Sequence, residues 1–353
     1  MLPQYLLGKT FDCDCGRTHT VSLQAFIYSP NALDRLPKLL THAVPARSQL
    51  RIVADTRTYD AAGHRVEKVL KDDWDTQTTI IRDGPDNTPV CDDHTRDRLV
   101  QTIGDSWDVM IAVGSGVVND LCKWIASQQG KPYLTVATAA SMNGYASVNV
   151  APSIDGVKQI VNGCVPFAIL AMPDVIEDAP FELTAAGLGD VIAKPVSTTD
   201  WKINNVLFDE YFCPLCCRLI EDIEPLYMSS PQKIRNLDPE TIRGLFSALG
   251  YSGISMTMAG SSSPASGGEH LISHTLDMKG KSENRPLQLH GSQVGVATIF
   301  VCALYERLLQ MESPQFREVV EETDSAYWKS LTDAVEAQHA LKRRKVAHAT
   351  DRL

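Results

Sequence analysis

The sequence lacks several features that would each define a class of protein. No apolar run reaches the roughly 18 residues that a membrane-spanning helix needs, and the longest, 294–305, is predicted to be a buried helix. The first 16 residues contain no basic stretch followed by a long apolar segment, so we predict no secretory signal. Internal repeats and low-complexity segments are also absent. We therefore expect a cytoplasmic protein without membrane insertion.

An excess of positive charge is also missing. Lys and Arg number 33 against 43 Asp and Glu, which gives a formal net charge of −10. Nucleic acids and anionic membranes are bound by basic surfaces, so we expect neither as a partner. An anionic small molecule would need a local site that works against the overall negative field.

A disulfide framework is not expected, although the chain has nine cysteines. They are odd in number and scattered over a long chain, which is typical of a reducing compartment. Cys13 and Cys15 with His19 form half of a zinc-site pattern, and the segment 213–217 (CPLCC) forms another half. Neither half is complete and they lie far apart in the chain, so ordinary buried thiols on a turn and a helix are the competing interpretation.

The pattern of apolar residues changes along the 353-residue chain. Apolar strand-like runs, each followed by an amphipathic stretch in the first half, lie at 25–29, 50–55, 78–83, 108–114 and 133–138. This alternation is typical of a parallel sheet wrapped by helices, and continuously apolar strands are expected where both faces are covered. Helical periodicity then predicts helices at 185–194, 205–226, 239–258, 268–276, 291–311 and 313–344.

We therefore predict an α/β protein with two domains. Residues 1–175 form a Rossmann-like parallel-sheet domain that binds NAD, and residues 176–353 form an all-helical metal and substrate domain. The active site is expected in the cleft between them.

Two features of the first half point to a nucleotide. Gly114, Ser115 and Gly116 separate a predicted strand from a predicted helix, where backbone N–H groups and the helix N-terminus favour a phosphate. The third glycine of the Rossmann fingerprint is replaced by Asn119, so a tight turn without a ligand is the alternative. Asp55 ends another strand, where an acid takes the ribose 2′-hydroxyl and favours NAD over NADP. An N-cap is the alternative role of Asp55.

The second half contains residues suited to a metal. His270 and His274 lie four positions apart on one face of a predicted helix, and His290 precedes another helix. Asp190 lies on a helix that follows a glycine-rich turn. An aspartate and histidines from separate helices can build a divalent metal site, and three protein ligands leave a position for a substrate oxygen. Ordinary core or surface histidines are the alternative.

Six strings occur in one order along the chain: VADTRTY, AVGSGVVNDLCKW, ATAASMNGYAS, AGLGDVIAKPVSTTDW, GSSSPASGGEHLISHTLD and LHGSQVGVATIF. With them, the chain resembles the sn-glycerol-1-phosphate dehydrogenases of the iron-containing alcohol dehydrogenase and dehydroquinate synthase superfamily. The resemblance covers residues 25–309, and the early CxCG stretch is similar to the bacterial branch.

The resemblance implies roles for individual residues. Asp190, His270 and His290 match the metal ligands, with zinc the usual ion and nickel or iron the other candidates. His274 matches the catalytic residue that reaches the substrate. Asp190 is also implied to be catalytic and to bind substrate, and Asn143 is implied to bind substrate from its loop. An aspartate at position 190 is typical of the dehydrogenases, since dehydroquinate synthases have glutamate there. The implied cofactor-binding residues are Asp55, Gly114, Gly116, Val117, Val118, Asn119, Asp120, Thr138, Ala139, Ala140, Ser141 and Ser147.

The implied reaction is the reversible, NAD-dependent and metal-dependent reduction of dihydroxyacetone phosphate to sn-glycerol 1-phosphate, a step of phospholipid biosynthesis. We expect the enzyme to be a homo-oligomer. Two positions depart from the family, because Asn143 replaces Asp and Ser263 replaces Arg; Lys158 and Lys194 lie in matching neighbourhoods. These departures favour one alternative, a dehydrogenase of another small polyol or hydroxy-ketone. A cyclase or lyase similar to dehydroquinate synthase is a further alternative.

Overall fold

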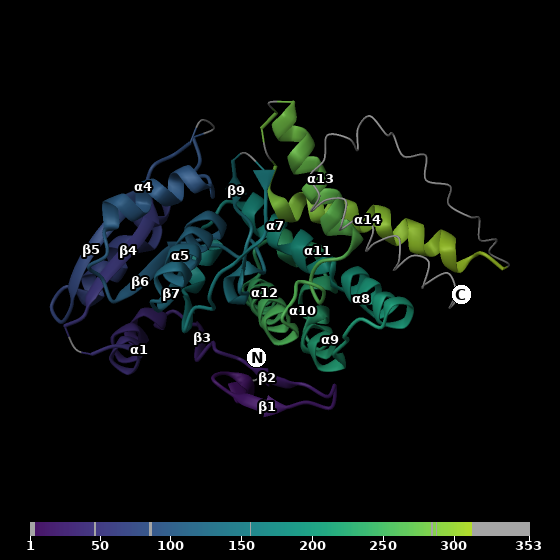
Figure 1. Ribbon diagram of the computed structural model, residues 1–353, viewed down its shortest axis with the longest axis horizontal. Coiled ribbons are helices and arrows are strands. Elements are labelled where there is room, and N and C mark those ends of the chain that lie inside the picture. The colour runs from purple at the N-terminus through teal and green to yellow at the C-terminus, as the bar shows by residue number, and fades with distance from the viewer. Residues whose placement is uncertain are drawn as a thin grey trace, which may run out of the picture.

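A six-stranded sheet forms the first half of the molecule. The structure is a computed structural model that describes residues 4–45, 47–84, 87–155, 157–283, 285–286 and 288–312. The sheet has the order β3-β12-β7-β6-β4-β5, and all its neighbouring strands are parallel, as predicted (Figure 1). Its strands are β3 (Ala25–Tyr28), β4 (Gln49–Asp55), β5 (Asp75–Ile81), β6 (Val109–Gly114), β7 (Tyr133–Ala137) and β12 (Ala168–Ala171).

Helices cover both faces of the sheet. Because successive side chains of a strand point to opposite faces, Ile52 and Ile111 pack in one cluster with α1 (Leu36–Ala43) and α3 (His64–Leu70). Val53 and Met110 pack in another cluster with α4 (Asp93–Ile103) and α5 (Gly116–Gln129). The central strands are therefore apolar on both faces, which explains their continuous apolar runs.

The described residues that follow β12 contain helices and no strand. They are α6 (Pro173–Glu177), α7 (Phe181–Ile192), α8 (Lys194–Phe208), α9 (Pro214–Glu221), α10 (Glu224–Met228), α11 (Pro231–Arg235), α12 (Pro239–Ala259), α13 (Gly268–Ser282) and α14 (His290–Leu309). The single helix predicted at 205–226 was wrong. The chain leaves the helix at Asp209 with a φ of 54°, and α9 restarts with Pro214 in its first turn. The helix predicted at 313–344 lies outside the described residues.

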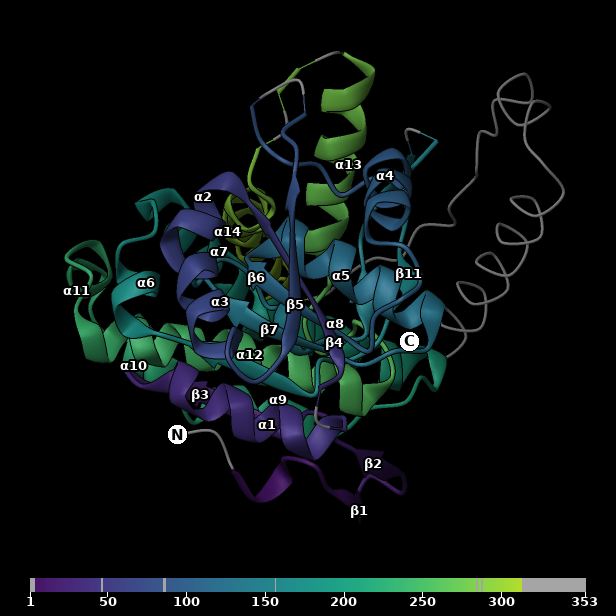
Figure 2. The same ribbon diagram turned by 90° about the vertical axis from the view of Figure 1, so that its left-hand side faces the viewer.

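The remaining elements are short. They are β1 (Thr10–Asp12), β2 (Thr18–Thr20), β8 (Asn149–Val150), β9 (Ser153–Ile154), β10 (Val157–Lys158), β11 (Val161–Asn162), α2 (Thr56–Thr58), the 3₁₀ turns Gln4–Leu6, Ala32–Arg35 and Gly144–Ala146, and the π-turn Tyr59–Gly63. Strands β1 and β2 form an antiparallel hairpin along one edge of the molecule (Figure 1 and Figure 2). Leu6, Val21 and Leu23, which flank it, belong to the core of the helical half.

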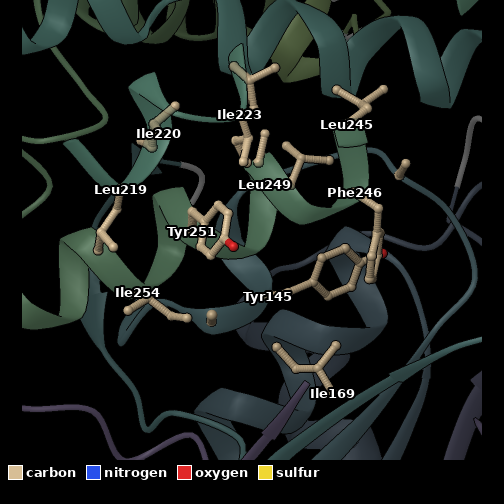
Figure 3. Close-up of a cluster of buried hydrophobic side chains, with 14 of the residues drawn as sticks. Tyr145, Ile169, Leu219, Ile220, Ile223, Leu245, Phe246, Leu249, Tyr251 and Ile254 are labelled. Atoms are coloured by element: carbon tan, nitrogen blue, oxygen red, sulfur yellow. The ribbon is translucent and has the colours of Figure 1, made fainter. Parts of the chain in front are cut away.

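An apolar core joins the sheet to the helices. Phe246 of α12 packs against Phe26 and Tyr28 of β3 and against Tyr145, with ring centroids 5.2 to 6.0 Å apart. Figure 3 shows Tyr145 and Phe246 side by side, with Ile169 of β12 below them. The helical half therefore packs directly against the part of the sheet formed by β3 and β12.

Helix α14 differs from its prediction as a buried helix. Val296, Ile299 and Phe300 are exposed, at 70%, 69% and 57%. By length and composition α14 could cross a membrane, because its mean hydropathy is 1.3, although 33% of this apolar segment is buried inside the protein. A single helix of this kind is weak evidence of a membrane span, because core helices have the same composition. Its other face lies against α7 and α13 and includes Gly291, Val294 and Gly295.

Candidate functional site

The carboxyl ends of β4, β6 and β7 form one edge of the sheet, of the kind at which parallel sheets bind nucleotides. We call it the nucleotide-type edge. From β4 the chain continues to β5 on one side, whereas β6 and β7 lie on the other side of β4. Ligands of open parallel sheets bind at such a reversal of strand order. Asp55 and Gly114 end the two strands at this point, and Thr138 follows β7, where its N–H donates to the carbonyl of Gly114. The topology thus brings the three predicted cofactor loops to one edge.

The turn at residues 114–116 fits an anion. Ser115 is the N-cap of α5 and makes no side-chain cap, so the first N–H groups of α5 donate no hydrogen bond to its hydroxyl. Gly114 is required by packing, since a Cβ there would lie 2.6 Å from the Cβ of Val118. At Gly116 a Cβ would meet only the sulfur of Met142, at 3.6 Å. Gly116 therefore leaves open space at the N-terminus of α5, as close approach of a phosphate requires.

Several predicted cofactor residues hold the fold instead of facing the edge. Asn119 is fully buried, and its Oδ1 accepts from the Thr135 hydroxyl at 2.8 Å. Ala140 is also fully buried, and the hydroxyl of Ser147 bonds to backbone carbonyls of its own loop. Five predicted cofactor residues are at most 2% exposed, and their contact with a cofactor stays a prediction: Val118, Asn119, Ala139, Ala140 and Ser147.

A buried cation orders the loop after β7. Lys123 of α5 is fully buried, and its ammonium donates to the carbonyls of Gly144 and Asn149 at 2.6 and 3.0 Å. Asp120, which was predicted to contact the cofactor, lies 3.5 Å from the same ammonium. Burial lowers the pKa of Lys123, and the charge of Asp120 partly restores it. Asp120 therefore helps to balance this charge.

Asp55 is an N-cap in the structure. Its Oδ1 accepts from the N–H groups of Arg57 and Thr58 at 2.8 and 3.1 Å, and the Thr58 hydroxyl accepts from the N–H of Asp55. This is the alternative role that the sequence left open. Both cap bonds use Oδ1, so a hydrogen bond from a ribose hydroxyl to Oδ2 is compatible with the cap. Arg57 also forms a two-pronged ion pair with Asp83 at the end of β5.

Glycines bring α7 and α14 together. A Cβ on Gly189 would lie 2.1 Å from the carbonyl oxygen of Gly291, and a Cβ on Gly291 would lie 1.9 Å from that of Ala186. Any side chain at either position would force the two helices apart. Gly189 precedes Asp190 and Gly291 follows His290, so this crossing places these two side chains at one site.

Asp200 of α8 fixes the start of α13. Its Oδ2 accepts from the N–H of Gly268 at 2.7 Å, and its Oδ1 accepts from the hydroxyl of Tyr305 on α14. One carboxylate therefore ties α8, α13 and α14 together. No pattern in the sequence indicated this role of Asp200, because its partners come from distant segments.

Asp190, His270 and His290 meet from α7, α13 and α14. Their ligand atoms all lie within 4.8 Å of one another. Asp190 is 1% exposed and His270 is 5% exposed, whereas His290 is half-buried. One carboxylate and two imidazoles match the donors that zinc takes at catalytic sites. The structure thus brings the predicted ligands together, and their role as ligands stays a prediction.

Neighbouring groups orient both imidazoles. His270 Nδ1 lies 2.7 Å from Oε1 of Glu269, and His290 Nδ1 lies 3.1 Å from the hydroxyl of Ser273. The Ser273 hydroxyl donates to Gln293, so it accepts from His290. With each Nδ1 as donor, loss of any proton on Nε2 frees the Nε2 lone pair for a metal in the cluster. Sequence reasoning missed Glu269 and Ser273, although both share a helix with His270.

The charges of the cluster favour a cation. Burial raises the pKa of Asp190, but the hydrogen bond from His270 and the charge of Lys194 outweigh it and hold that pKa well below its usual value. Burial lowers the pKa of His270, but its bonds to Asp190 and Glu269 raise it overall. Burial also raises the pKa of Glu269, and bonds from His270 and Gly267 lower it overall. Two buried carboxylates thus surround one positive charge, and a divalent metal fits this environment.

The loop after β7 directly contacts the cluster of Asp190, His270 and His290. Asn143 donates from its backbone N–H and its side-chain amide to the two carboxylate oxygens of Asp190, at 2.8 and 3.0 Å. An aspartate at 143 would place two carboxylates against each other. His274 is half-buried, and its ring stacks on that of His290 with centroids 5.6 Å apart. The nucleotide edge and the cluster are therefore adjacent.

Lys194, one of the two lysines in the neighbourhood of the family arginine at position 263, does not lie open at the site. Lys194 is 3% exposed, and its ammonium donates to the carbonyl of Ala265 at 3.0 Å. It thus holds the loop that contains Ser263, whose hydroxyl bonds only locally to Ser261. The side chain of Lys158 lies outside what the structure describes.

Replacing Glu269 by Gln should weaken metal binding. The amide still accepts from His270 but carries no charge, and loss of such an orienting carboxylate typically costs 10–100-fold in metal affinity. We expect about that loss in a competition titration of zinc against a coloured chelator. Glu240→Gln, at an exposed position of α12, should bind zinc like the unmodified protein. Equal affinity of both variants would mean that Glu269 does not orient His270.

Comparison with known proteins supports these observations. Residues 27–180 match the family of iron-containing alcohol dehydrogenases. The glycerol-1-phosphate dehydrogenase [NAD(P)+] of Halalkalibacterium halodurans is 33% identical over 297 residues, 84% of this chain and 74% of that protein. The enzyme of the same name from Pyrococcus furiosus is 35% identical over 259 residues, 73% of this chain and 72% of that protein. Glycerol dehydrogenase of Schizosaccharomyces pombe has the same fold, with a TM-score of 0.65 at 18% identity over 80% of this chain and 71% of that one.

The parallel sheet, the helical half and the carboxylate–imidazole cluster define an oxidoreductase of the iron-containing alcohol dehydrogenase type. Within this class, the chain belongs to the glycerol-1-phosphate dehydrogenase family.

Proposed function

We propose that the protein catalyses the reversible, NAD-dependent and metal-dependent reduction of dihydroxyacetone phosphate to sn-glycerol 1-phosphate. The observation that carries this proposal is the meeting of Asp190, His270 and His290 beside the nucleotide-type edge. The names of the relatives support the substrate and an NAD(P) cofactor. The product would serve as a phospholipid backbone made in the cytoplasm, and the enzyme would work as a homo-oligomer.

The chain would hold the cofactor and the metal with different halves. The N–H groups of Gly116 and Val117 would donate hydrogen bonds to the pyrophosphate, and Asp55 Oδ2 would accept one from the adenosine ribose. Asp190, His270 and His290 would hold the metal, with zinc favoured by the donor set. When bound, the ion supplies a Lewis acid for the substrate carbonyl.

The other groups of the site position the substrate and move a proton. His274, stacked on His290, would exchange a proton with the oxygen on C2. Asn143 fixes both oxygens of Asp190 and closes the gap between the sheet and the helices. With the nicotinamide at the sheet edge, only one face of C2 would receive hydride, which yields one stereoisomer.

A second candidate is a metal-dependent dehydrogenase of a small hydroxy-ketone without phosphate. Ser263 and the buried Lys194 favour it, because neither offers an open cation to a phosphate. The deciding experiment compares NADH oxidation with dihydroxyacetone phosphate and with dihydroxyacetone, before and after chelation and zinc readdition. Turnover of the phosphorylated ketone that chelation abolishes supports the proposal. Turnover of the unphosphorylated ketone alone supports the second candidate.

Replacing Asp55 by Asn should shift the preference from NAD toward NADP. Asn caps helices as well as Asp does, so α2 keeps its cap while the charge that repels a 2′-phosphate disappears. We expect the ratio of kcat/KM for NADPH over NADH to rise about tenfold, or about 1.4 kcal/mol. Asp75→Asn, at the opposite end of the strands, should leave the ratio unchanged. An unchanged ratio in Asp55→Asn would restrict Asp55 to its role as a cap.

A further inference from the structure

A second cluster of metal-binding residues lies far from the nucleotide edge, where the N-terminal hairpin meets the helical half. Cys13 and Cys15 lie in the turn of the hairpin, and His19 lies on β2. Cys213 lies 200 positions after Cys13 in the sequence and is the N-cap residue of α9. One ligand atom from each of the four lies within 4.8 Å of all the others. The two halves of the zinc-site pattern that the sequence left apart are therefore joined.

The spacing of these atoms matches the edges of a zinc tetrahedron. With Zn–S bonds of about 2.3 Å and Zn–N bonds of about 2.05 Å, tetrahedral geometry puts two sulfurs about 3.8 Å apart and a sulfur and a nitrogen about 3.6 Å apart. Cys13 Sγ and Cys213 Sγ lie 3.9 Å apart. His19 Nε2 lies 3.3 Å from Cys15 Sγ and 3.5 Å from Cys213 Sγ.

The surroundings prepare the histidine for ligation. His19 is 1% exposed, and its Nδ1 lies 2.8 Å from the carbonyl oxygen of Met258 at the end of α12. A carbonyl can only accept, so Nδ1 carries the proton and Nε2 presents its lone pair to the three sulfurs. Zinc-ligating histidines commonly have this outer bond.

Further contacts suit the negative charge of three thiolates. The hydroxyl of Tyr211 lies 3.1 Å from Cys15 Sγ and can donate to a thiolate. The guanidinium of Arg17 lies over the Tyr211 ring, 3.4 Å from its centroid. A zinc ion with three thiolates and one imidazole carries a net charge of −1, which a neighbouring cation and a hydroxyl donor stabilise.

We propose that Cys13, Cys15, His19 and Cys213 bind a structural zinc ion that fastens the β1–β2 hairpin to the helical half. Three cysteines and one histidine form a closed four-ligand set, with no open position for a substrate. A disulfide between Cys13 and Cys213 would not explain why Cys15 and the oriented His19 lie at the same place. No disulfide is formed by any of the nine cysteines in the part of the chain that the structure describes. The site shares no residue with the Asp190 cluster and does not depend on the proposed reaction.

X-ray absorption of the zinc-loaded protein, purified under reducing conditions, tests the proposal. Sulfur neighbours at about 2.3 Å from zinc are expected, and they can come only from this site, because the Asp190 cluster contains no sulfur. The double variant Cys13→Ser/Cys213→Ser should lose one zinc ion per chain and all sulfur neighbours. Cys217→Ala, four residues along on α9, is the matched control and should keep both.

Thiol labelling of the unmodified protein provides the same test without a variant. With zinc bound, the half-buried Cys13 and Cys15 should resist alkylation, and after chelation they should react, while the exposed Cys302 reacts in both states. Amide exchange in the hairpin should also become faster after chelation, because its tie to α9 is gone. Zinc with only nitrogen and oxygen neighbours, or equal labelling of Cys13 and Cys15 with and without zinc, would show that the proposal is wrong.

Discussion

Replacing His270 by Ala should remove the metal from the Asp190 cluster and, with it, the activity. The variant loses one of three ligands, and it also leaves the buried carboxylates of Asp190 and Glu269 without the group that lies between them. We expect metal content to fall by one ion per chain, and kcat/KM to fall at least a thousandfold, about 4 kcal/mol. Metal analysis after gel filtration and steady-state kinetics measure the two effects.

His274→Ala is the matched comparison, one turn along the same helix. Its ring stacks on His290, but it does not belong to the group formed by Asp190, His270 and His290. We expect this variant to keep its metal and to lose turnover, because the proposed proton transfer is lost while the ion stays. A His270→Ala protein with full metal content would contradict the ligand assignment. Loss of metal from His274→Ala would move the site toward the alternative group of His274, Asp277 and His290.

The sequence predicted the sheet well because its signals are local. Each central strand is a short apolar run next to an amphipathic helix, and five of the six strands lie where the pattern indicated. Strand β12 and the β1–β2 hairpin were not predicted, and the two hairpin strands have only three residues each, too few for a reliable period. The break between α8 and α9 had a visible signal, since Pro214 interrupts the predicted helix.

The candidate sites were predictable only in part. The spacing of His270 and His274 places both on one helix face, but the approach of Asp190 depends on packing between α7 and α14. The position of Asp55 fitted both a ribose-binding acid and an N-cap, and only the folded structure shows its carboxylate capping α2. The meeting of Cys13 with Cys213 depends on where a hairpin packs against a distant helix. Contacts of this sequence separation leave no periodic trace in one sequence.

The second large effect is expected from replacing Gly291 by Ala, where α7 and α14 cross. The substitution adds a single methyl group between the two helices. Gly→Ala inside a helix ordinarily stabilises it by up to about 1 kcal/mol, because the backbone is less flexible in the unfolded chain. At Gly291 the sign should reverse, since the new Cβ would lie 1.9 Å from the carbonyl oxygen of Ala186. We expect Gly291→Ala to lower the free energy of unfolding by about 3 kcal/mol, as overpacking does.

The same substitution should damage the metal site more than global stability indicates. His290 is the residue before Gly291, so a shift of α14 away from α7 moves this imidazole away from Asp190. Urea unfolding followed by circular dichroism gives the stability, and zinc titration of the folded variant gives the affinity. Ser292→Ala, on the same turn but exposed, should change the free energy of unfolding by less than about 0.5 kcal/mol and leave zinc affinity intact. If Gly291→Ala were as stable as Ser292→Ala and bound zinc equally well, close contact between these helices would not be what assembles the site.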